Sequence, residues 1–209
     1  AEIVSVGRRS CELRIERMLK VQFFGPDVWL VFAPIKRARI DFLAAKATEL
    51  GVSALWPVLS ARTETRRINL GRLRANAVEA AEQCGRVDIP EVLTVAELEF
   101  ALSKWPIERH MLVCDPTTAG RPVAEVLSGR SHSDHSPWAI LTGPEGGFTR
   151  SELDGLEKLP FVSHADLGPR TLRAETAGLA ALACWQALLG DWRHGASSPV
   201  EQSGFVIQA

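Results

Sequence analysis

The stretch WAILTGPEGGFTRSEL, residues 138–153, contains an apolar strand pattern, a glycine-rich turn and the start of a helix in direct succession. The five residues from Trp138 to Thr142 are typical of a strand that is buried on both faces. Thr149 is followed three residues later by Glu152, a capping-box pattern that predicts a helix beginning at Arg150. A buried strand that leads through a turn into a helix is the repeating unit of α/β folds.

The same alternation of short apolar runs and helical patterns continues on both sides of this stretch. We expect strands at 28–33, 54–59, 110–114, 138–142 and 161–167, and helices near 38–50, 70–84, 94–102, 121–127, 150–158 and 173–189. Gly51 and Gly85 stand where a glycine usually ends a helix. The alternation predicts a mainly parallel sheet, which binds ligands beyond the carboxyl ends of its strands.

The N-terminal segment has a different pattern. Residues 2–6 and 11–17 alternate apolar and polar side chains around a polar turn at 7–10, which predicts a β-hairpin. Two strands cannot bury a core alone, so we interpret residues 1–22 as the remaining part of a small β domain. Residues 23–27 are then a linker, 28–192 the main domain and 193–209 a C-terminal tail.

The composition is that of an ordinary globular protein. The 209 residues include 24 basic and 25 acidic side chains, a formal net charge of −1, and 46% of them are hydrophobic, which excludes disordered and collagen-like classes. The apolar stretch from Ala177 to Leu189 is shorter than the roughly 20 residues that span a bilayer, so we expect no membrane segment. The four cysteines are widely separated, which favours reduced core thiols of a cytoplasmic protein over metal ligands.

Basic side chains are concentrated between residues 62 and 74. The five arginines there are accompanied only by Glu64: Arg62, Arg66, Arg67, Arg72 and Arg74. Such a cluster could neutralise several phosphates of a nucleic acid while the net charge stays near zero. A solvated helix face is the alternative interpretation.

Two glycine-containing loops are the strongest candidates for a ligand site. The loop 143–147 follows a buried strand but matches neither the dinucleotide fingerprint nor the P-loop, and a simple tight turn is the alternative. In the segment VSHADLGPRTLRAETA, residues 162–177, Pro169 forces a turn before the next helix. Arg170 and Arg173 there oppose the helix dipole, which costs free energy unless an anionic or polar group is bound, and a surface network with Glu175 is the alternative interpretation.

Four segments of the chain together closely resemble the RsmE family. They are 143–148 (GPEGGF), 167–177 (LGPRTLRAETA), 46–52 (KATELGV) and 79–86 (EAAEQCGR). Members of this family are SPOUT-class methyltransferases that methylate N3 of a uridine in 16S ribosomal RNA of the small subunit with S-adenosylmethionine. The resemblance covers about residues 28–192. It implies a SPOUT-type parallel sheet flanked by helices, a C-terminal trefoil knot and a cytoplasmic homodimer, preceded by a PUA-like β-barrel of which residues 1–22 are a remnant.

The resemblance also implies roles for individual residues. The expected cofactor-binding residues are Leu141, Thr142, Gly143, Glu145, Gly146, Gly147, Leu167, Gly168, Arg170, Leu172, Thr176 and Ala177. The expected RNA-binding residues are Arg62, Arg66, Arg67, Arg72, Arg74, Gln83 and Arg86. The expected catalytic residues are Arg173 or Arg170, which would stabilise negative charge on the uracil, and Glu175 or Glu145, which would position that arginine or accept the N3 proton. No metal is required, because the methyl group is already activated.

Two other functions fit the same patterns. A SPOUT enzyme that acts on transfer RNA would keep the cofactor loops and change only the substrate. A non-catalytic RNA-binding assembly factor would keep the basic region and need no cofactor, which both glycine loops argue against. Cofactor binding separates the second alternative from the first.

Overall fold

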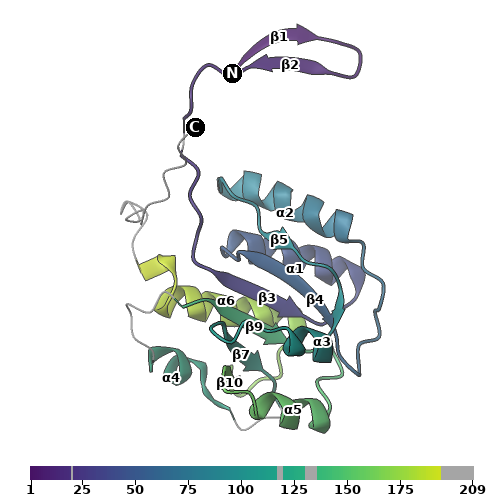
Figure 1. The fold of residues 1–209 in the computed structure, drawn as a ribbon, viewed down its shortest axis with the longest axis vertical. Coiled ribbons are helices and arrows are strands. Elements are labelled where there is room, and N and C mark those ends of the chain that lie inside the picture. The colour runs from purple at the N-terminus through teal and green to yellow at the C-terminus, as the bar shows by residue number, and fades with distance from the viewer. Residues whose placement is uncertain (20, 117–119, 130–135, 194–209) are drawn as a thin grey trace.

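A computed structural model describes residues 1–19, 21–116, 120–129 and 136–193 (Figure 1). Its centre is a parallel sheet of eight strands, in which the main path has the order β5-β4-β3-β9-β7-β10-β8 and β6 also pairs with β4. The long strands are β3 (Val28–Phe32), β4 (Ala54–Leu59), β7 (His110–Cys114), β9 (Trp138–Thr142) and β10 (Val162–Asp166). The short strands are β5 (Glu91–Val92), β6 (Ala96–Glu97) and β8 (Arg121–Pro122). The predicted α/β class with a parallel sheet is confirmed.

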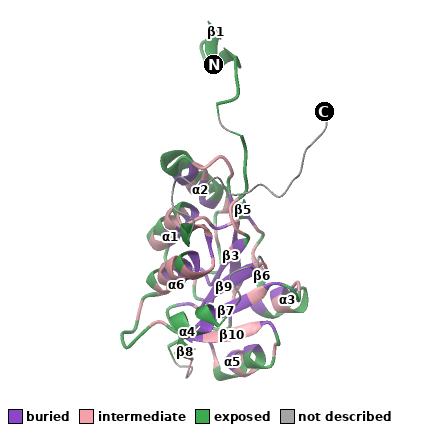
Figure 2. Ribbon diagram, turned by 90° about the vertical axis from the view of Figure 1, so that its left-hand side faces the viewer, coloured by how far each residue is buried: buried purple, intermediate pink, exposed green. Residues whose placement is uncertain are grey.

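Helices cover both faces of the sheet (Figure 2). One face carries α1 (Arg37–Glu49), α2 (Leu70–Cys84), α4 (Val123–Ser128) and α6 (Ala174–Leu188), and the 3-10 helix η1 (Asp191–Arg193) follows α6. The other face carries the shorter α3 (Leu98–Ser103) and α5 (Arg150–Glu157). Each face has its own buried apolar cluster, and the fully buried strand β9 contributes to both of them.

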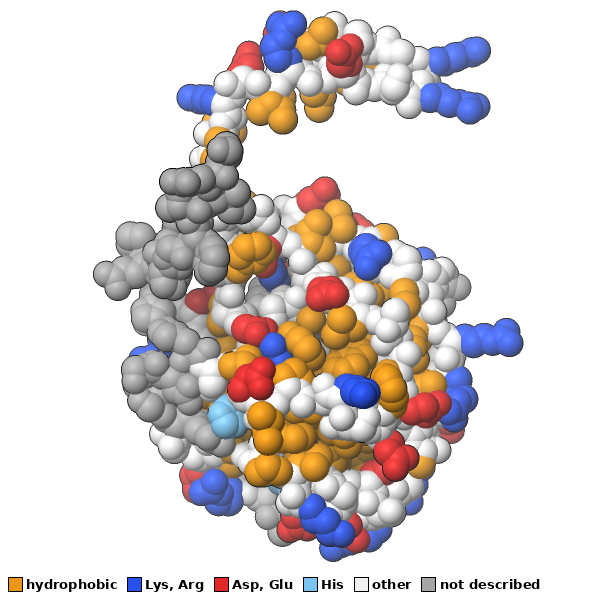
Figure 3. Space-filling view, viewed as in Figure 1, with side chains coloured by type: hydrophobic (Ala, Val, Ile, Leu, Met, Phe, Trp, Pro, Cys, Tyr) orange, Lys and Arg blue, Asp and Glu red, His pale blue; other side chains and the backbone are white. Residues whose placement is uncertain are grey.

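The face covered by α3 and α5 gathers many hydrophobic side chains (Figure 3). Trp29, Trp56 and Trp105 pack together there with ring centroids 5.7 to 6.0 Å apart. Trp29 and Trp56 remain partly exposed, because two short helices cover less of the sheet than the four on the opposite face.

Local sequence signals place most element ends correctly. The Thr149 hydroxyl accepts a hydrogen bond from the Glu152 N–H at 3.2 Å, and the Glu152 carboxylate accepts one from the Thr149 N–H at 2.7 Å, which confirms the capping box. Gly51 and Gly85 have φ angles of 84° and 71°, the left-handed conformation expected after a helix.

Two predicted helices begin later than expected. The helix predicted from residue 94 begins at Leu98, and the helix predicted from residue 121 begins at Val123. In both cases the preceding pair of residues joins the sheet, as β6 beside β4 and as β8 beside β10. These pairings depend on strands that are distant in sequence, so hydrophobic periodicity did not reveal them.

The predicted N-terminal hairpin is confirmed as β1 (Glu2–Val6) and β2 (Cys11–Arg14), although its second strand ends three residues before the predicted Arg17. Every residue of both strands is exposed, and the hairpin lies apart from the main sheet in Figure 1. Of the predicted tail, 193–209, only Arg193 lies within the described residues.

The prediction that all four cysteines lie in or near the core is wrong for two of them. Cys114 is buried and Cys184 is half-buried, whereas Cys11 and Cys84 are exposed. Cys11 lies in the hairpin, which has no core, and Cys84 ends the outermost helix, α2. None of the four forms a disulfide. No helix in the described part of the chain is long and apolar enough to cross a membrane.

An ion pair fixes the linker to the sheet. The Arg109 guanidinium donates to both carboxylate oxygens of Asp27, at 2.9 and 2.6 Å, and lies 3.7 Å from the Trp29 ring centroid. Burial alone would raise the pKa of Asp27, but the hydrogen bonds from Arg109 and Ser53 outweigh it and hold the pKa below 3.8. The pair holds the chain where the linker enters β3.

We expect Asp27→Asn to be less stable than the parent protein by about 1 kcal/mol or less at neutral pH, because the carboxylate is half exposed. The folded-state pKa is lowered, so the carboxylate stabilises the fold above pH 3.8, and this contribution is lost as the pH falls through the folded value. Denaturant unfolding of both proteins between pH 7 and pH 2 measures the difference. A difference that did not shrink below pH 3.8 would contradict the assignment. Asp154→Asn, which removes an exposed helix-surface pair, is the control.

Candidate active site

A pocket of about 270 Å³ lies at the carboxyl edge of the sheet. Its walls are residues 114–116 at the end of β7, 142–145 and 147 at the end of β9, and 171–174 and 177 just before and within the first turn of α6. Three segments that are far apart in the sequence therefore meet at the edge where parallel sheets bind ligands.

The glycine loop brings backbone to the wall of this pocket. A Cβ atom on Gly143 would lie 3.1 Å from the Phe148 ring, so a larger side chain would displace that ring. Gly147 has a φ of 65°, which other residues rarely adopt, and its N–H donates to the Pro144 carbonyl at 2.8 Å. The loop is therefore a shaped turn whose backbone a ligand could approach closely.

Arg62, which does not line the pocket, holds the glycine loop in place. Its guanidinium donates to the carbonyl oxygens of Gly146 and Phe148 at 2.9 and 3.2 Å. The adjacent Ala61 N–H donates to the Glu152 carboxylate at 2.8 Å. The first arginine of the basic segment thus supports the pocket, a contact that spacing along the sequence does not reveal.

The two carboxylates considered as proton acceptors share one arginine that the sequence analysis missed. Arg39 on α1 lies 3.7 Å from Glu145 Oε1 and 3.5 Å from Glu175 Oε1. Arg39 therefore connects α1 to both glycine-containing segments. Its position in a helical pattern without an accompanying motif gave no signal in the sequence.

The environments of the two carboxylates differ. The Glu175 side chain is 10% exposed, and its second oxygen, Oε2, is buried with no hydrogen-bond partner among the described residues. The Glu145 side chain is 42% exposed and lines the pocket. An unsatisfied buried carboxylate oxygen costs free energy unless a donor reaches it, so Glu175 Oε2 is a free hydrogen-bond acceptor, although Glu175 itself does not line the pocket.

Asp115 is a further pocket residue that the sequence analysis missed. It follows β7 directly, is 4% exposed and lies 3.5 Å through one carboxylate oxygen from the Phe148 N–H. The rule that ligands bind beyond the carboxyl ends of parallel strands could have identified it, since it is the first residue after the predicted strand 110–114.

The structure places the expected cofactor residues in two groups. Those that line the pocket are Thr142, Gly143, Glu145, Gly147, Leu172 and Ala177. The others, which do not line it, are Leu141, Gly146, Leu167, Gly168, Arg170 and Thr176. Leu141 is buried within β9, and Arg170 is exposed. Arg173 lines the pocket and is exposed at the start of α6.

The expected RNA-binding arginines also divide. Arg66 pairs with Glu97 at 2.8 Å, and Arg72 donates three hydrogen bonds of 2.7 to 2.9 Å to Asp41. Arg67 and Arg74 are exposed and have no ion pair with another described residue, and Gln83 is exposed on α2. The positive charge that remains available therefore lies around Arg67 and Arg74.

Arg86 has internal partners. Its guanidinium donates to the Thr48 and Val52 carbonyl oxygens at 2.7 and 3.1 Å and pairs with Asp88 at 2.7 Å. Its side chain is only 13% exposed. These contacts join the end of α2 to the end of α1, and they favour a structural role over a phosphate contact.

Fold and pocket together define an α/β domain with a pocket at the carboxyl edge of a parallel sheet, the edge where such sheets bind ligands. Among the described residues, no group of three or more histidine, cysteine or acidic side chains is arranged to hold a metal ion. The chain belongs to the RNA methyltransferase domain family, whose profile matches residues 25–186.

The chain is also similar to individual proteins that are named as methyltransferases. The "Ribosomal RNA small subunit methyltransferase E" of Rickettsia conorii is 28% identical over 183 residues, which cover 88% of this chain and 73% of the relative. The crystal structure of the Neisseria gonorrhoeae protein of that name, bound to S-adenosyl methionine, is 34% identical with a TM-score of 0.72, over 81% of this chain and 70% of that one. A putative methyltransferase from Legionella pneumophila, also bound to this cofactor, is 28% identical with a TM-score of 0.79, over 90% and 78%.

Proposed function

We propose that this protein transfers a methyl group from S-adenosylmethionine to N3 of a uridine in 16S ribosomal RNA. The observation that carries the proposal is the pocket between the two glycine-containing segments, in a chain of the RNA methyltransferase family. Two relatives at 28% and 34% identity are bound to this cofactor. We place the reaction in the cytoplasm, where small ribosomal subunits are assembled.

The residues of the pocket fit this cofactor. The volume of the pocket, about 270 Å³, lies just below the range of about 300–1,000 Å³ for small-molecule sites. S-adenosylmethionine carries a positive sulfonium and an ammonium group, which the carboxylates of Asp115 and Glu145 complement, and a carboxylate, which Arg173 complements. When bound, the cofactor supplies a methyl group that its positively charged sulfur has already activated.

The residues around the pocket supply the remaining chemistry. Uracil N3 is an imide nitrogen and must lose its proton before it becomes a competent nucleophile. We assign the proton acceptor to Glu175, because its Oε2 is buried and has no hydrogen-bond partner within the described part of the chain. Arg39 orients Glu175 through its other oxygen. We assign the stabilisation of negative charge on the uracil oxygens to Arg173, which lines the pocket, or to the exposed Arg170.

We further propose that the C-terminal part of the domain forms the trefoil knot of the SPOUT class. β10 lies beyond β7 in the sheet, yet α6, which follows it, packs on β9 and against α1. The chain leaving β10 must therefore return across the carboxyl edge, where the segments 171–174 and 142–147 line one pocket. This return path supports the threaded arrangement.

The same proposal extends to the subunit and domain organisation. We infer a homodimer, since α6 is apolar on its outward side, where Leu179, Ala180 and Ala183 remain partly exposed. We interpret residues 1–22 as part of a PUA-like β domain, since their paired strands bury no side chain. Residues 23–27 then link it to the methyltransferase domain at 28–192.

Titration calorimetry with S-adenosylmethionine and S-adenosylhomocysteine, followed by methylation of small subunits that lack the modification, tests the proposed function. We expect micromolar cofactor binding and transfer of a labelled methyl group to 16S ribosomal RNA. A folded protein that bound neither ligand would overturn the enzyme assignment and favour an assembly factor. Transfer to transfer RNA, without transfer to ribosomal RNA, would leave the cofactor site intact and overturn the substrate.

A further inference from the structure

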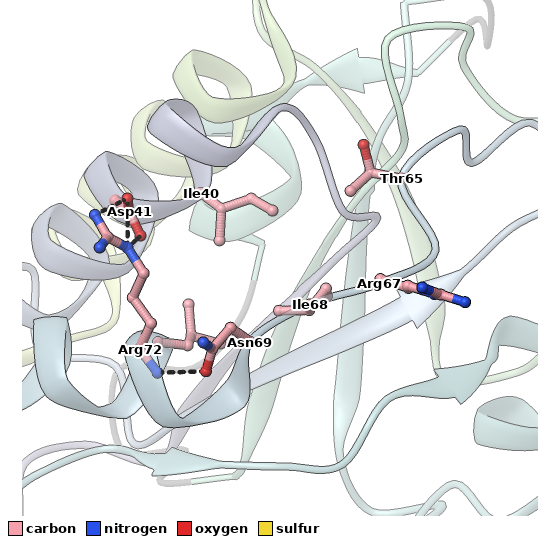
Figure 4. A pocket seen from close by; sticks show the side chains of 8 residues that line it. Ile40, Asp41, Thr65, Arg67, Ile68, Asn69 and Arg72 are labelled. Carbon is pink, nitrogen blue, oxygen red and sulfur yellow. Dashed lines mark hydrogen bonds and ion pairs between the residues drawn. The ribbon is translucent and has the colours of Figure 1, made fainter.

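A second pocket, of about 390 Å³, lies near the starts of two helices (Figure 4). It lies between the start of α1, the segment 65–69 and the start of α2. Ile40 and Asp41, which line it, directly follow Arg39, the partner of Glu145 and Glu175. The segment that forms its other wall begins near Arg62, which holds the glycine loop. The second pocket is therefore close in sequence to two arginines, Arg39 and Arg62, that contact residues at the candidate active site.

The interior of this second pocket suits a flat, partly polar group. Ile40, Ile68 and Leu73 supply apolar surface, and Thr65 lies at the rim with a hydroxyl group. The side-chain oxygen of Asn69, Oδ1, accepts the N-cap hydrogen bond from the Arg72 N–H. The side-chain NH₂ group of Asn69 therefore remains available to donate. Apolar walls with a few placed donors are typical of sites for small ring systems.

Arg72 adds a fixed planar surface. Three hydrogen bonds to Asp41 hold its guanidinium group at the edge of the pocket (Figure 4). The Arg72 side chain is 46% exposed. The ion pair is neutral overall, so Arg72 offers a plane more than a charge. Unpaired RNA bases stack on such guanidinium planes.

Positive charge lies at the opposite rim. Arg67 points outward from the pocket (Figure 4) and has no ion pair with another described residue. The exposed Arg74 lies in the first turns of α2. A phosphate attached to a nucleoside in the pocket would meet this charge. The combination of an apolar interior, a fixed guanidinium plane and a free arginine is complementary to one nucleotide of a single strand.

We propose that this second pocket binds one unpaired nucleotide of the RNA substrate, near the uridine that is methylated. Its base stacks on Arg72 against the apolar wall, and its phosphate contacts Arg67. The inference rests on the proposed function and adds a substrate-binding site to it. Holding a neighbouring nucleotide fixes the position of the strand and so presents the target base to the cofactor pocket.

The test compares binding of two fluorescent strands of equal length, an oligouridylate and its abasic ribose-phosphate counterpart. The parent protein is expected to bind the oligouridylate more tightly, and Arg72→Lys, which keeps the charge but lacks the plane, to lower that affinity ratio by about fivefold or more. Arg150→Lys, which changes another ion-paired arginine on α5, is the matched control. An unchanged ratio in Arg72→Lys would overturn the stacking role.

A second measurement examines the phosphate contact and the location. Arg67→Glu is expected to weaken binding of both strands and to reduce the dependence of affinity on salt, whereas Arg150→Glu leaves both unchanged. Strands that carry 4-thiouridine are expected to crosslink on irradiation to residues 65–73. Crosslinks confined to other segments would overturn the proposal. Cofactor titration of the same variants separates the two hypotheses, since intact cofactor binding with unchanged RNA binding contradicts only this inference.

Discussion

Glu175→Gln is expected to lower the kcat of methyl transfer by about 10²- to 10⁴-fold, the usual contribution of a positioned general base. The amide has the shape of the carboxylate but cannot take the N3 proton. The Glu175 Oε2 atom has no hydrogen-bond partner among the described residues, so the substitution removes no bond there. Single-turnover transfer of a labelled methyl group measures kcat, and calorimetry shows whether cofactor affinity is retained.

Glu145→Gln is the matched control for that prediction. Glu145 contacts the same arginine, Arg39, but its side chain is 42% exposed, so its loss is expected to reduce the rate far less. Thermal unfolding of both variants shows whether the fold is preserved. If Glu175→Gln kept full activity while Glu145→Gln lost it, Glu145 would be the proton acceptor and the assignment of Glu175 would be wrong.

Ala177→Trp is expected to weaken S-adenosylmethionine binding by about 100-fold or more, equivalent to about 2.7 kcal/mol. Ala177 is a half-buried residue of α6 that lines the pocket of about 270 Å³, and an indole ring there would take the space of the ligand. Titration calorimetry with S-adenosylmethionine and S-adenosylhomocysteine measures the loss.

The control for this variant is Ala187→Trp, the same change at an exposed position of the same helix. It is expected to bind both ligands like the parent protein. Wild-type affinity in a correctly folded Ala177→Trp protein would move the cofactor away from this pocket. The assignment of the segments 142–147 and 171–174 as its walls would then be abandoned.

Several features of the fold were readable because their causes are local. An apolar run predicts the strand at 138–142, and the capping box of Thr149 and Glu152 predicts the start of α5. Gly51 and Gly85 end their helices in the left-handed conformation that glycine adopts without strain. Each of these signals involves residues within one turn or one strand.

The site was predicted only in part, because some of its residues are defined by local signals and others by contacts between distant segments. The glycine segments were identified because a turn depends on a few consecutive residues. Six of the twelve expected cofactor residues, from Thr142 to Ala177, line the pocket. Arg39 and Asp115 were missed, because each matters through neighbours that come from other strands and helices. Arg86 was predicted to bind RNA, yet its guanidinium donates to the Thr48 and Val52 carbonyl oxygens.

The order of the long strands and the helices, the parallel sheet and the two glycine-containing segments could be predicted from the sequence, since these follow from short-range periodicity and turn chemistry. Which charged side chains pair with one another depends on contacts between elements that are distant in the sequence. Arg62, Arg72 and Arg86 were all predicted to bind RNA, but in the folded protein they contact the Gly146 carbonyl oxygen, Asp41 and Asp88, respectively. Ion pairs and hydrogen bonds act over a few ångströms in space, whatever the separation along the chain. The pattern of free and occupied arginines, and with it the proposed path of the RNA, is therefore a property of the fold.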